Sequence, residues 1–337
     1  MSLATKYRPN RWEDVLGQDS IVTILNQQIV SGNIKNTYIF SGASGCGKTT
    51  IARLFVEKIN NGMGQPLELD AASNSGVDNI REIVKHAQER AVDSEYKAYI
   101  IDECHALSNQ AWQAFLKCIE EPPKYTIFIF CTTEPEKIPD TIKNRCMRFN
   151  FNRISSELIH SRLLHIAESE NAINYEDTCD YISRICNGEM RNAISLLEKC
   201  LDYTNDININ NALYCLGDYS YETKFDLVDA IIDGHLEKAL SIIDNLFNSG
   251  ANLSKFVDSF IEFNVDILKY ILYNDIKCTK LPLNLGERLK FSTGFNDAKK
   301  YYFYILDNLL ETRNMLKTTP LVKPTVEIMI SKMCRLA

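Results

Sequence analysis

Residues 42–49 read Gly-Ala-Ser-Gly-Cys-Gly-Lys-Thr, which fits the phosphate-binding pattern G-x-x-x-x-G-K-[ST] without a mismatch. Glycines in such a loop bring backbone N–H groups close to an anion, and the helix that follows adds unsatisfied donors. Lys48 can reach the β- and γ-phosphates of a nucleotide, and the Thr49 hydroxyl can ligate Mg²⁺. The residues expected to contact the phosphates are Gly42, Ala43, Ser44, Gly45, Cys46, Gly47, Lys48, Thr49 and Thr50.

The segments on either side of this loop decide how its pattern is interpreted. A glycine-rich turn that contains Lys-Thr by coincidence would also match. Residues 37–41 are apolar enough to form a buried strand, and residues 50–56 have the composition of a helix. Because a phosphate loop connects a strand to a helix, this context favours nucleotide binding.

A second segment, residues 97–103, ends in an adjacent Asp and Glu after an apolar stretch. Ligands bind at the carboxyl ends of the strands in a parallel sheet. Asp102 would hold the Mg²⁺ coordination sphere, largely through water, and Glu103 would orient and polarise an attacking water. An Asp-Glu pair after a strand is common by itself. After a phosphate loop it predicts a site that hydrolyses the nucleotide.

Residues 129–135 form another apolar stretch that ends in two hydroxyls, Thr132 and Thr133. One of them can hydrogen-bond the attacking water or the γ-phosphate, between the two earlier motifs. Both can also cap the turn before Pro135 without any catalytic role. The pattern leaves these alternatives open.

Two arginines lie outside these motifs, Arg145 before the last strand-like segment and Arg191 near the start of a later helix. Isolated arginines usually form surface salt bridges of little energetic weight. A planar guanidinium also suits phosphate recognition, and an arginine from a neighbouring subunit can accelerate hydrolysis. Spacing in the sequence does not choose between these roles.

The chain has 337 residues, of which 45% are hydrophobic and 24% are charged. No apolar run approaches the roughly 20 residues of a membrane span, and the N-terminus lacks the apolar core of a signal peptide, so a cytoplasmic protein is expected. The net charge of −7 means that DNA binding would need a local basic surface or backbone N–H contacts. The 11 cysteines show no zinc spacing, so no zinc is expected, and without a secretion signal reduced thiols are expected.

The order of strand-like and helix-like segments predicts three domains. Residues 1–154 alternate between strands at 37–41, 67–70, 98–101, 127–131 and 147–151 and helices at 20–31, 49–60, 77–90 and 109–120, which is typical of a parallel α/β sheet. Residues 155–216 carry helical periodicity at 156–170, 175–186 and 190–202. Residues 217–337 follow with helices expected at 221–233, 235–249, 253–274, 287–291, 297–317 and 324–335.

With these motifs in order, the chain resembles the gamma/tau motor subunits of DNA polymerase III, the ATPases of bacterial sliding-clamp loaders within the AAA+ family. The matching segments run collinearly from residue 3 to about 200 and lie at 7–9, 14–18, 42–49, 69–73, 101–108, 115–123, 132–135, 144–146 and 188–197. Residues 215–337 match only in being helical and of suitable length. The resemblance implies an AAA+ domain, a small helical lid domain and an all-α collar domain.

The resemblance also implies roles for single residues. Thr133 is similar to the sensor at the end of the fourth strand, and Arg191 to a second sensor in the lid. Arg145 is similar to the finger that completes the ATP site of the neighbouring subunit. The residues that would wrap the adenine are Tyr7, Arg8, Pro9, Val15 and Leu16. Ser73, Asn74 and Ser75 lie where such proteins face the DNA backbone, although they can equally cap the next helix.

ATP and Mg²⁺ are the cofactors that the resemblance implies. The implied partners are other subunits of a pentameric loader, a sliding clamp and primer–template DNA. The chain departs from the family pattern at 60–66, where no four-cysteine zinc module is present, and at Asn144, where the finger motif usually has Ser. Because the chain ends near the third domain, it is expected to be a short form of bacterial or phage origin, without the extensions that hold helicase and polymerase.

Three other functions fit parts of the sequence. An AAA+ ATPase for recombination or branch migration would carry a winged helix at its C-terminus. The order Asp102-Glu103-Cys104-His105 also matches a DExH-type helicase, which would need a second RecA-like domain. A non-enzymatic scaffold is disfavoured, because Lys48 and Glu103 are both intact.

Overall fold

A sheet of five parallel strands organises the N-terminal part of the computed structural model, which describes residues 1–73, 76–282 and 285–334. Its strands are β1 (Thr37–Gly42), β2 (Leu67–Asp70), β3 (Lys97–Asp102), β4 (Thr126–Thr132) and β5 (Met147–Phe151). Their order across the sheet is β2-β3-β4-β1-β5. The carboxyl ends of β1, β3 and β4 are therefore neighbours, and the segments that follow these strands can form one site.

Both faces of this sheet are apolar, as expected for parallel strands that helices cover on both sides. One face packs in a buried cluster with Tyr38, Phe40, Ala98, Ile100, Ile127, Ile129, Cys131, Phe149 and Phe151. The other face contributes Ile39, Tyr99, Ile101, Phe128 and Phe130 to a second cluster. This alternation of neighbouring residues between faces follows from the two-residue period of a strand.

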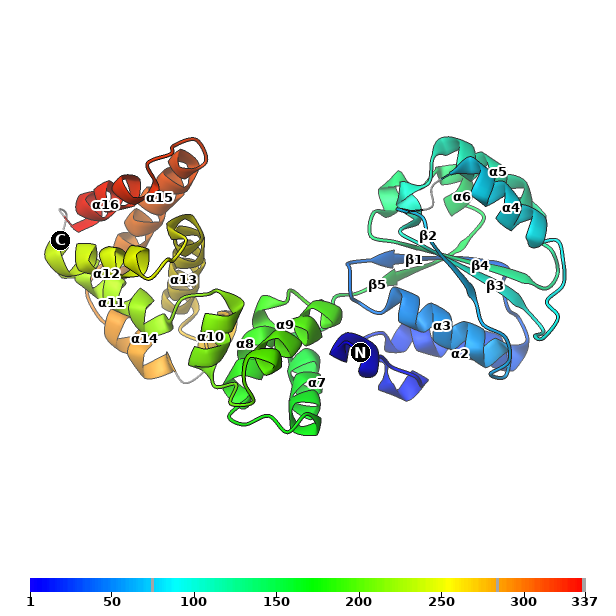
Figure 1. Cartoon of the computed structure of the whole chain (residues 1–337), viewed down its shortest axis with the longest axis horizontal. Coiled ribbons are helices and arrows are strands. Elements are labelled where there is room, and N and C mark those ends of the chain that lie inside the picture. Colours follow the sequence, from blue (N-terminus) through cyan, green and yellow to red (C-terminus); the bar gives the residue numbers. More distant parts are fainter. Residues whose placement is uncertain (74–75, 283–284, 335–337) are drawn as a thin grey trace. The chain divides into compact units, whose positions relative to one another are not determined.

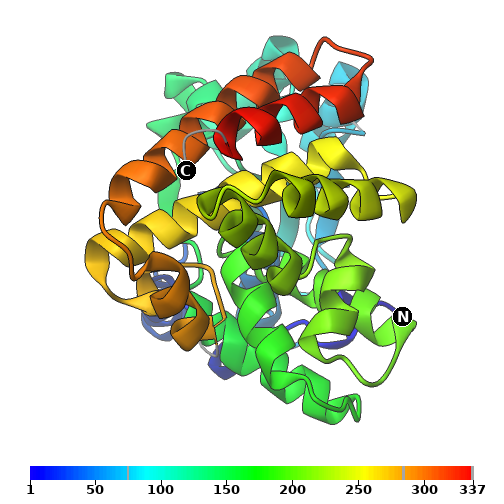
Figure 2. The same ribbon diagram turned by 90° about the vertical axis from the view of Figure 1, so that its left-hand side faces the viewer.

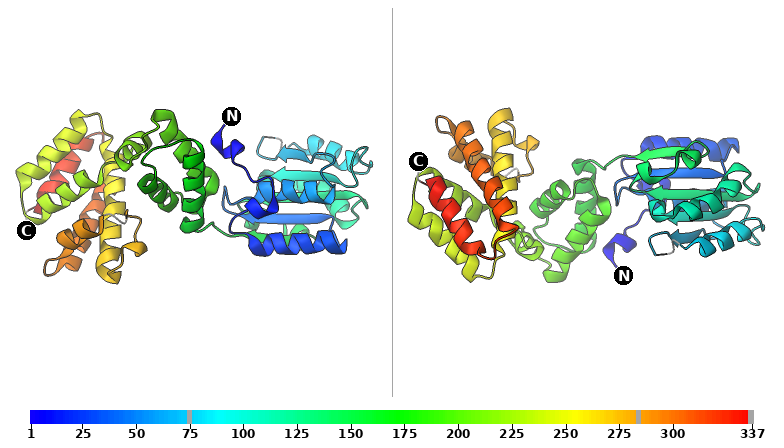
Figure 3. Two further views of the ribbon diagram at one scale, coloured as in Figure 1. Left: turned by 90° about the horizontal axis from the view of Figure 1, so that it is seen from below. Right: turned by 90° about the horizontal axis from the view of Figure 1, so that it is seen from above.

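Helices cover each face of the sheet (Figure 1, Figure 3). The first face packs against α2 (Asp19–Ser31) and α3 (Lys48–Ile59), and the second against α4 (Val77–His86), α5 (Asn109–Glu120) and α6 (Asp140–Lys143). Before α2 lie α1 (Leu3–Lys6) and the short helix η1 (Trp12–Asp14), whereas η2 (Cys104–Ala106) and η3 (Pro135–Lys137) follow β3 and β4.

The chain divides into two compact units, and the sheet belongs to the unit formed by Met1–Ile166 and Cys186–Ser195. The other unit, Ala167–Ile185 with Leu196–Ala337, is helical where it is described. Helices beyond the sheet are α7 (Ser156–Ser169), α8 (Glu176–Ile185), α9 (Met190–Tyr203), α10 (Ile209–Leu216), α11 (Tyr221–Ile232), α12 (Leu236–Asn248), α13 (Leu253–Tyr273), η4 (Ile276–Cys278), α14 (Gly286–Thr293), α15 (Ala298–Leu316) and α16 (Val322–Met333).

Helices α11 to α16 share one hydrophobic core, in which α13 and α15 run alongside each other (Figure 2). Large side chains fill it, among them Phe225, Phe256, Phe260, Tyr302 and Leu309. A buried polar network lies at the start of α11. The Asp218 carboxylate accepts from the Tyr181 hydroxyl at 2.6 Å and from the Lys224 ammonium at 3.0 Å. The buried Lys224 ammonium thus has a carboxylate partner, as burial requires.

The predicted fold class is confirmed, and each predicted strand is found to within one residue at either end. Some helix predictions are wrong in part. The helices at 3–6, 140–143 and 209–216 are not among the predicted ones, α4 ends at His86 rather than at 90, α14 ends at Thr293 rather than at 291, and α16 begins at Val322 rather than at Pro324. Pro324 is tolerated inside α16 because the first-turn amides of a helix have no partner to lose.

Beyond Phe151, the described residues form helices and one isolated bridge between Ile173 and Asp206. The second sheet domain that a DExH-type helicase requires is therefore not found among the described residues. In the same residues, no helix combines the length and the apolar character needed to cross a membrane. The domain boundaries at 154 and 216 stay predictions.

Candidate nucleotide-binding site

The loop between β1 and α3 has the backbone of a phosphate-binding turn. Gly42, Gly45 and Gly47 have φ values of 149°, 65° and 102°, which L-residues with a Cβ rarely adopt. Gly47 is the residue immediately before α3, whose first residue is Lys48. The loop is thus followed at once by a helix N-terminus, where unpaired N–H groups and the helix dipole favour an anion.

Lys48 lies folded over this loop with only 5% of its surface exposed. Its Nζ donates to the carbonyl oxygens of Gly42 and Ala43, both at 2.8 Å. These bonds hold the ammonium at the loop, where nucleotide phosphates would replace the carbonyls as partners. A charge-assisted bond to a phosphate oxygen is stronger than one to a neutral carbonyl, so this exchange favours binding.

Thr49 and Asp102 meet where α3 begins and β3 ends. The Thr49 hydroxyl donates to the Asp102 carboxylate at 3.0 Å. A hydroxyl and a carboxylate side by side are oxygen ligands of the kind that Mg²⁺ prefers, with its remaining positions left to water and phosphate. The two side chains predicted to hold Mg²⁺ therefore fit that ion.

Glu103 combines an uncommon backbone with a side chain held at the end of β4. Its φ of 46° and ψ of 42° are left-handed, which is uncommon for a residue other than glycine. Its N–H donates to Asp102 at 3.0 Å, and its carboxylate accepts from the Thr133 hydroxyl at 3.3 Å. The two predicted catalytic side chains, Glu103 and Thr133, are thus in contact.

The two threonines after β4 have different roles. The Thr132 hydroxyl accepts from the Glu134 N–H at 2.9 Å and so caps the turn. Thr133 instead points its hydroxyl to Glu103. The turn-capping alternative therefore applies to Thr132, whereas the role of Thr133 as a sensor stays a prediction.

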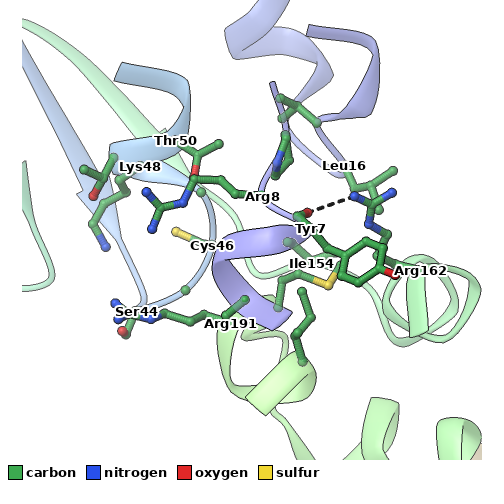
Figure 4. A pocket seen from close by; sticks show the side chains of 18 of the residues that line it. Tyr7, Arg8, Leu16, Ser44, Cys46, Lys48, Thr50, Ile154, Arg162 and Arg191 are labelled. Atoms are coloured by element: carbon green, nitrogen blue, oxygen red, sulfur yellow. Dashed lines mark hydrogen bonds between the residues drawn. The ribbon is translucent and has the colours of Figure 1, made fainter. Parts of the chain in front are cut away.

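A cavity with about 1020 Å³ of empty space, its open mouth included, lies beside the loop (Figure 4). Of the residues predicted to contact nucleotide, those that line it are Tyr7, Arg8, Pro9, Val15, Leu16, Ser44, Gly45, Cys46, Gly47, Lys48, Thr49 and Thr50, together with Asp102, Glu103 and Arg191. All belong to the unit that contains the sheet. The structure therefore brings the loop, the Asp-Glu pair and the N-terminal segment to one cavity.

Six further residues line this cavity and were not predicted, namely Ala4, Asp14, Ile154, Arg162, Met190 and Ile194. Arg162 in α7 is the most informative of them. Its guanidinium donates to the Tyr7 carbonyl at 2.9 Å, drawn as the dashed line in Figure 4. This bond joins residues 155 positions apart in the chain, and no local sequence signal could have revealed it.

Gln18 connects the N-terminal segment to the phosphate loop. Its side chain is buried, donates to the carbonyls of Cys46 at 3.3 Å and Asn152 at 2.8 Å, and accepts from the Asn152 N–H. A buried amide with three such bonds fixes the distance between these segments. The Val-Leu-Gly-Gln run in the sequence signalled this segment but not the function of its last residue.

The two candidate arginines are placed differently. Arg191 is the second residue of α9 and lies against the loop, since a Cβ added at Gly45 would be 3.2 Å from the Cβ of Arg191. Figure 4 shows its side chain extending toward Ser44. Arg145 does not line the cavity. It donates to the Thr141 carbonyl at 2.7 Å and pairs with Glu120 at 2.7 Å, with 40% of its side chain exposed.

Of the residues predicted to face DNA, Asn74 and Ser75 lie outside the described residues. Ser73 donates to the Asp70 carboxylate at 2.8 Å. The residue that caps α4 is Gly76, so Ser73 does not cap that helix. The capping alternative is wrong for Ser73, and its contact with DNA stays a prediction.

Burial also governs the thiol in the loop. It raises the pKa of Cys46, and the neighbouring Lys48 ammonium offsets this only in part. The thiol therefore stays protonated at neutral pH and donates to the Ala43 carbonyl at 2.9 Å. Cys46 thus stabilises the turn rather than acting as a nucleophile.

Comparisons with known proteins show which families this chain is similar to. A profile of the family described as DNA polymerase III, delta subunit, matches residues 67–155. The DNA polymerase III subunit tau of Bacillus subtilis is 32% identical over 98% of this chain and 62% of its own length. The subunit gamma of Buchnera aphidicola from Schizaphis graminum is also 32% identical, over 77% of this chain and 78% of its own length.

The chain spans about three fifths of the length of some of these relatives, 62% for the B. subtilis protein and 55% for the gamma/tau subunit of Mycoplasma genitalium. Among solved structures, the RuvB Holliday junction branch migration motor of Thermotoga maritima aligns with a TM-score of 0.53 at 16% identity. That alignment covers 67% of this chain and 80% of RuvB. At this identity it supports the fold.

Proposed function

Because the chain belongs to the DNA polymerase III gamma/tau family, we propose that it is the ATP-hydrolysing motor subunit of a sliding-clamp loader. The observation that carries this proposal is that segments after three neighbouring strands come together at one site. Lys48 in the loop after β1 lines the cavity with Asp102 at the end of β3 and with Glu103. Thr133 after β4 contacts the Glu103 carboxylate from outside the cavity lining. In this function, ATP binding opens a ring-shaped clamp and grips primer–template DNA, and hydrolysis releases the clamp around the DNA.

The residues divide the reaction between them. Lys48 binds the β- and γ-phosphates, and the loop N–H groups surround them. Thr49 and Asp102 would hold Mg²⁺, which neutralises phosphate charge when bound. Glu103 accepts the proton of the attacking water, and Thr133 keeps the Glu103 carboxylate beside the γ-phosphate position. Arg191 in α9 acts as a second sensor, which detects the bound nucleotide.

Arg145 belongs to the ATP site of a neighbouring subunit in this proposal. It is exposed and outside its own chain's cavity, so its guanidinium is accessible to a partner. Its pairing with Glu120 is a surface ion pair, worth about 0–1 kcal/mol, which a phosphate can displace. The partners are further loader subunits in a pentamer, a clamp and primer–template DNA. Residues 155–216 would act as the lid and residues 217–337 as the collar.

The proposal is tested by separating binding from hydrolysis in the full chain. Lys48→Ala should lower ATP affinity at least about 100-fold, because it removes the phosphate-binding ammonium. Glu103→Gln should keep ATP affinity and lower single-turnover hydrolysis about 100-fold or more, because it removes the base. Lys58→Ala, an exposed lysine of the same helix, is the matched control and should change neither quantity.

A third variant addresses assembly. Arg145→Ala should bind ATP normally and lose DNA-stimulated turnover in the assembled complex. Mixing Arg145→Ala with Lys48→Ala should restore part of the turnover. The Arg145→Ala chain then supplies an intact phosphate loop, and the Lys48→Ala chain supplies Arg145 to it. Wild-type hydrolysis by Lys48→Ala would disprove the site, and unchanged turnover by Arg145→Ala would disprove the shared site only.

A further inference from the structure

His105 lies in η2, immediately after the Asp-Glu pair, and contacts three residues around the end of β4. Its Nδ1 is 3.3 Å from a carboxylate oxygen of Glu103 and 3.1 Å from the Thr132 hydroxyl. Its Nε2 is 3.2 Å from a carboxylate oxygen of Glu134. The side chain is 18% exposed, less than either carboxylate, so the imidazole is the inner member of the group.

The contacts fix the orientation of the ring. Thr132 already accepts from the Glu134 N–H, so its own hydroxyl proton is free to turn toward the imidazole or away from it. Glu134 also receives a bond from Lys137, which lowers the pKa of Glu134 and keeps it ionised. One nitrogen of His105 therefore faces a fixed anion at the end of β4, and the other faces Glu103.

We propose that His105 is a positioning residue, which sets the Glu103 carboxylate relative to the end of β4 and so controls turnover without contacting nucleotide. The inference rests on the proposed function of Glu103 as the base. His105 itself does not line the cavity, whereas Glu103 does. The loss of His105 should therefore change the chemical step and leave ATP binding intact.

The physical reason lies in how Glu103 is held. Its backbone is left-handed, and the Thr133 bond to its carboxylate is long at 3.3 Å. A base acts only within hydrogen-bond reach of the water that it deprotonates, and small displacements lower the rate steeply. When Nδ1 of His105 carries a proton, it donates toward the Glu103 carboxylate at 3.3 Å and restricts it as a second contact.

Two substitutions separate the two ring nitrogens. The amide nitrogen of an asparagine at 105 falls near the Nδ1 position, and that of a glutamine falls near Nε2. We expect His105→Ala to lower single-turnover hydrolysis about tenfold, with ATP affinity changed less than about twofold. His105→Asn should stay within about threefold of wild type, and His105→Gln should be as slow as His105→Ala, because only Asn keeps the contact with Glu103.

The matched control is His86→Ala, since His86 lies in α4 and pairs with Glu89 in a similar contact at 3.4 Å, away from the cavity. The full chain is assayed under the conditions in which wild type hydrolyses ATP. In a Glu103→Gln background, His105→Ala should cause no further loss, because both substitutions disable one unit.

Unchanged hydrolysis by His105→Ala would overturn the inference, as would an equal loss of ATP affinity. If His105→Ala does not fold, the inference is tested by comparing the hydrolysis rates of His105→Asn and His105→Gln. Equal rates for these two variants would overturn the inference. Full hydrolysis by Glu103→Gln would instead overturn the proposed function, so the two failures are distinguishable.

Discussion

The cavity has two walls that are built in different ways. The loop wall is the turn from Gly42 to Thr50, of which residues 44–50 line the cavity, together with Asp102 and Glu103. Within the turn the bonds are local, such as those from Lys48 to carbonyls five and six residues earlier. The N-terminal wall consists of residues 4–16 with Ile154, Arg162 and residues 190–194, which are distant in sequence. The bond from Arg162 to Tyr7 spans 155 positions.

This difference implies different sensitivities. The loop wall depends on backbone conformations that only glycine adopts easily, so it should fail when a Cβ is added. The N-terminal wall depends on single side-chain bonds between segments, each worth about 0.5–3 kcal/mol. Each substitution in the N-terminal wall should therefore lower ATP affinity by a limited factor rather than abolish binding.

The largest expected effect is that of Gly42→Ala in the loop wall. A Cβ at Gly42 would lie 2.5 Å from the Phe151 carbonyl oxygen, in the paired strand β5, and its φ of 149° is unfavourable for alanine. We expect the free energy of unfolding of the sheet unit to fall by about 4 kcal/mol, from strain and overpacking together. Thermal unfolding followed by circular dichroism measures this.

Gly32→Ala is the matched control for that substitution. Gly32 ends α2 with a φ of 66°, but a Cβ there would meet no atom within 4 Å. Its cost should therefore be about 1–2 kcal/mol, from backbone strain alone. If Gly42→Ala and Gly32→Ala lower the free energy of unfolding equally, the contact with β5 is not the reason that Gly42 is needed.

The next effect is that of Gln18→Ala, which removes the link between the walls. The buried Cys46 carbonyl loses the Gln18 donor, and Asn152 loses its partners, so unfolding should become easier by about 2–3 kcal/mol. Gln27→Ala, at an exposed glutamine of α2, the helix that Gln18 precedes, is the control. If Gln18→Ala lowers ATP affinity more than an Arg162 variant does, the two walls depend on each other for binding.

The contrast between the walls also explains what the sequence could predict. The strands, the loop and the Asp-Glu pair are short segments in which neighbouring residues determine the structure, and all were found within one residue of their expected bounds. The predicted contact of Thr133 with the site follows from the order of the strands, because β4 lies between β1 and β3.

Residues that act through long-range contacts were not predictable in this way. Arg162 lies in an amphipathic helix, and nothing in its neighbours distinguishes it from a surface arginine. His105 was considered in the sequence only as part of the DExH pattern, because its contact with Glu134 requires the turn after β4 to be placed. The missed helix α10 is only eight residues long and follows the polar loop at 202–206, and its Asn208 cap was a local signal that the prediction did not use.

The smallest expected effect, that of Arg162→Ala, tests the N-terminal wall alone. The Tyr7 carbonyl loses the Arg162 donor, and the segment that carries Tyr7 must then be ordered by the nucleotide itself. We expect ATP affinity to fall about five- to tenfold, equivalent to about 1–1.4 kcal/mol, without a change in single-turnover hydrolysis at saturating ATP. Arg162→Lys keeps one donor, so its ATP affinity should lie between those of wild type and Arg162→Ala. Arg148→Ala, a substitution of an exposed arginine of β5, should leave ATP affinity at the wild-type value. If Arg162→Ala lowers hydrolysis as much as affinity, the N-terminal wall would share the catalytic role of the loop wall, and the distinction between them would fail.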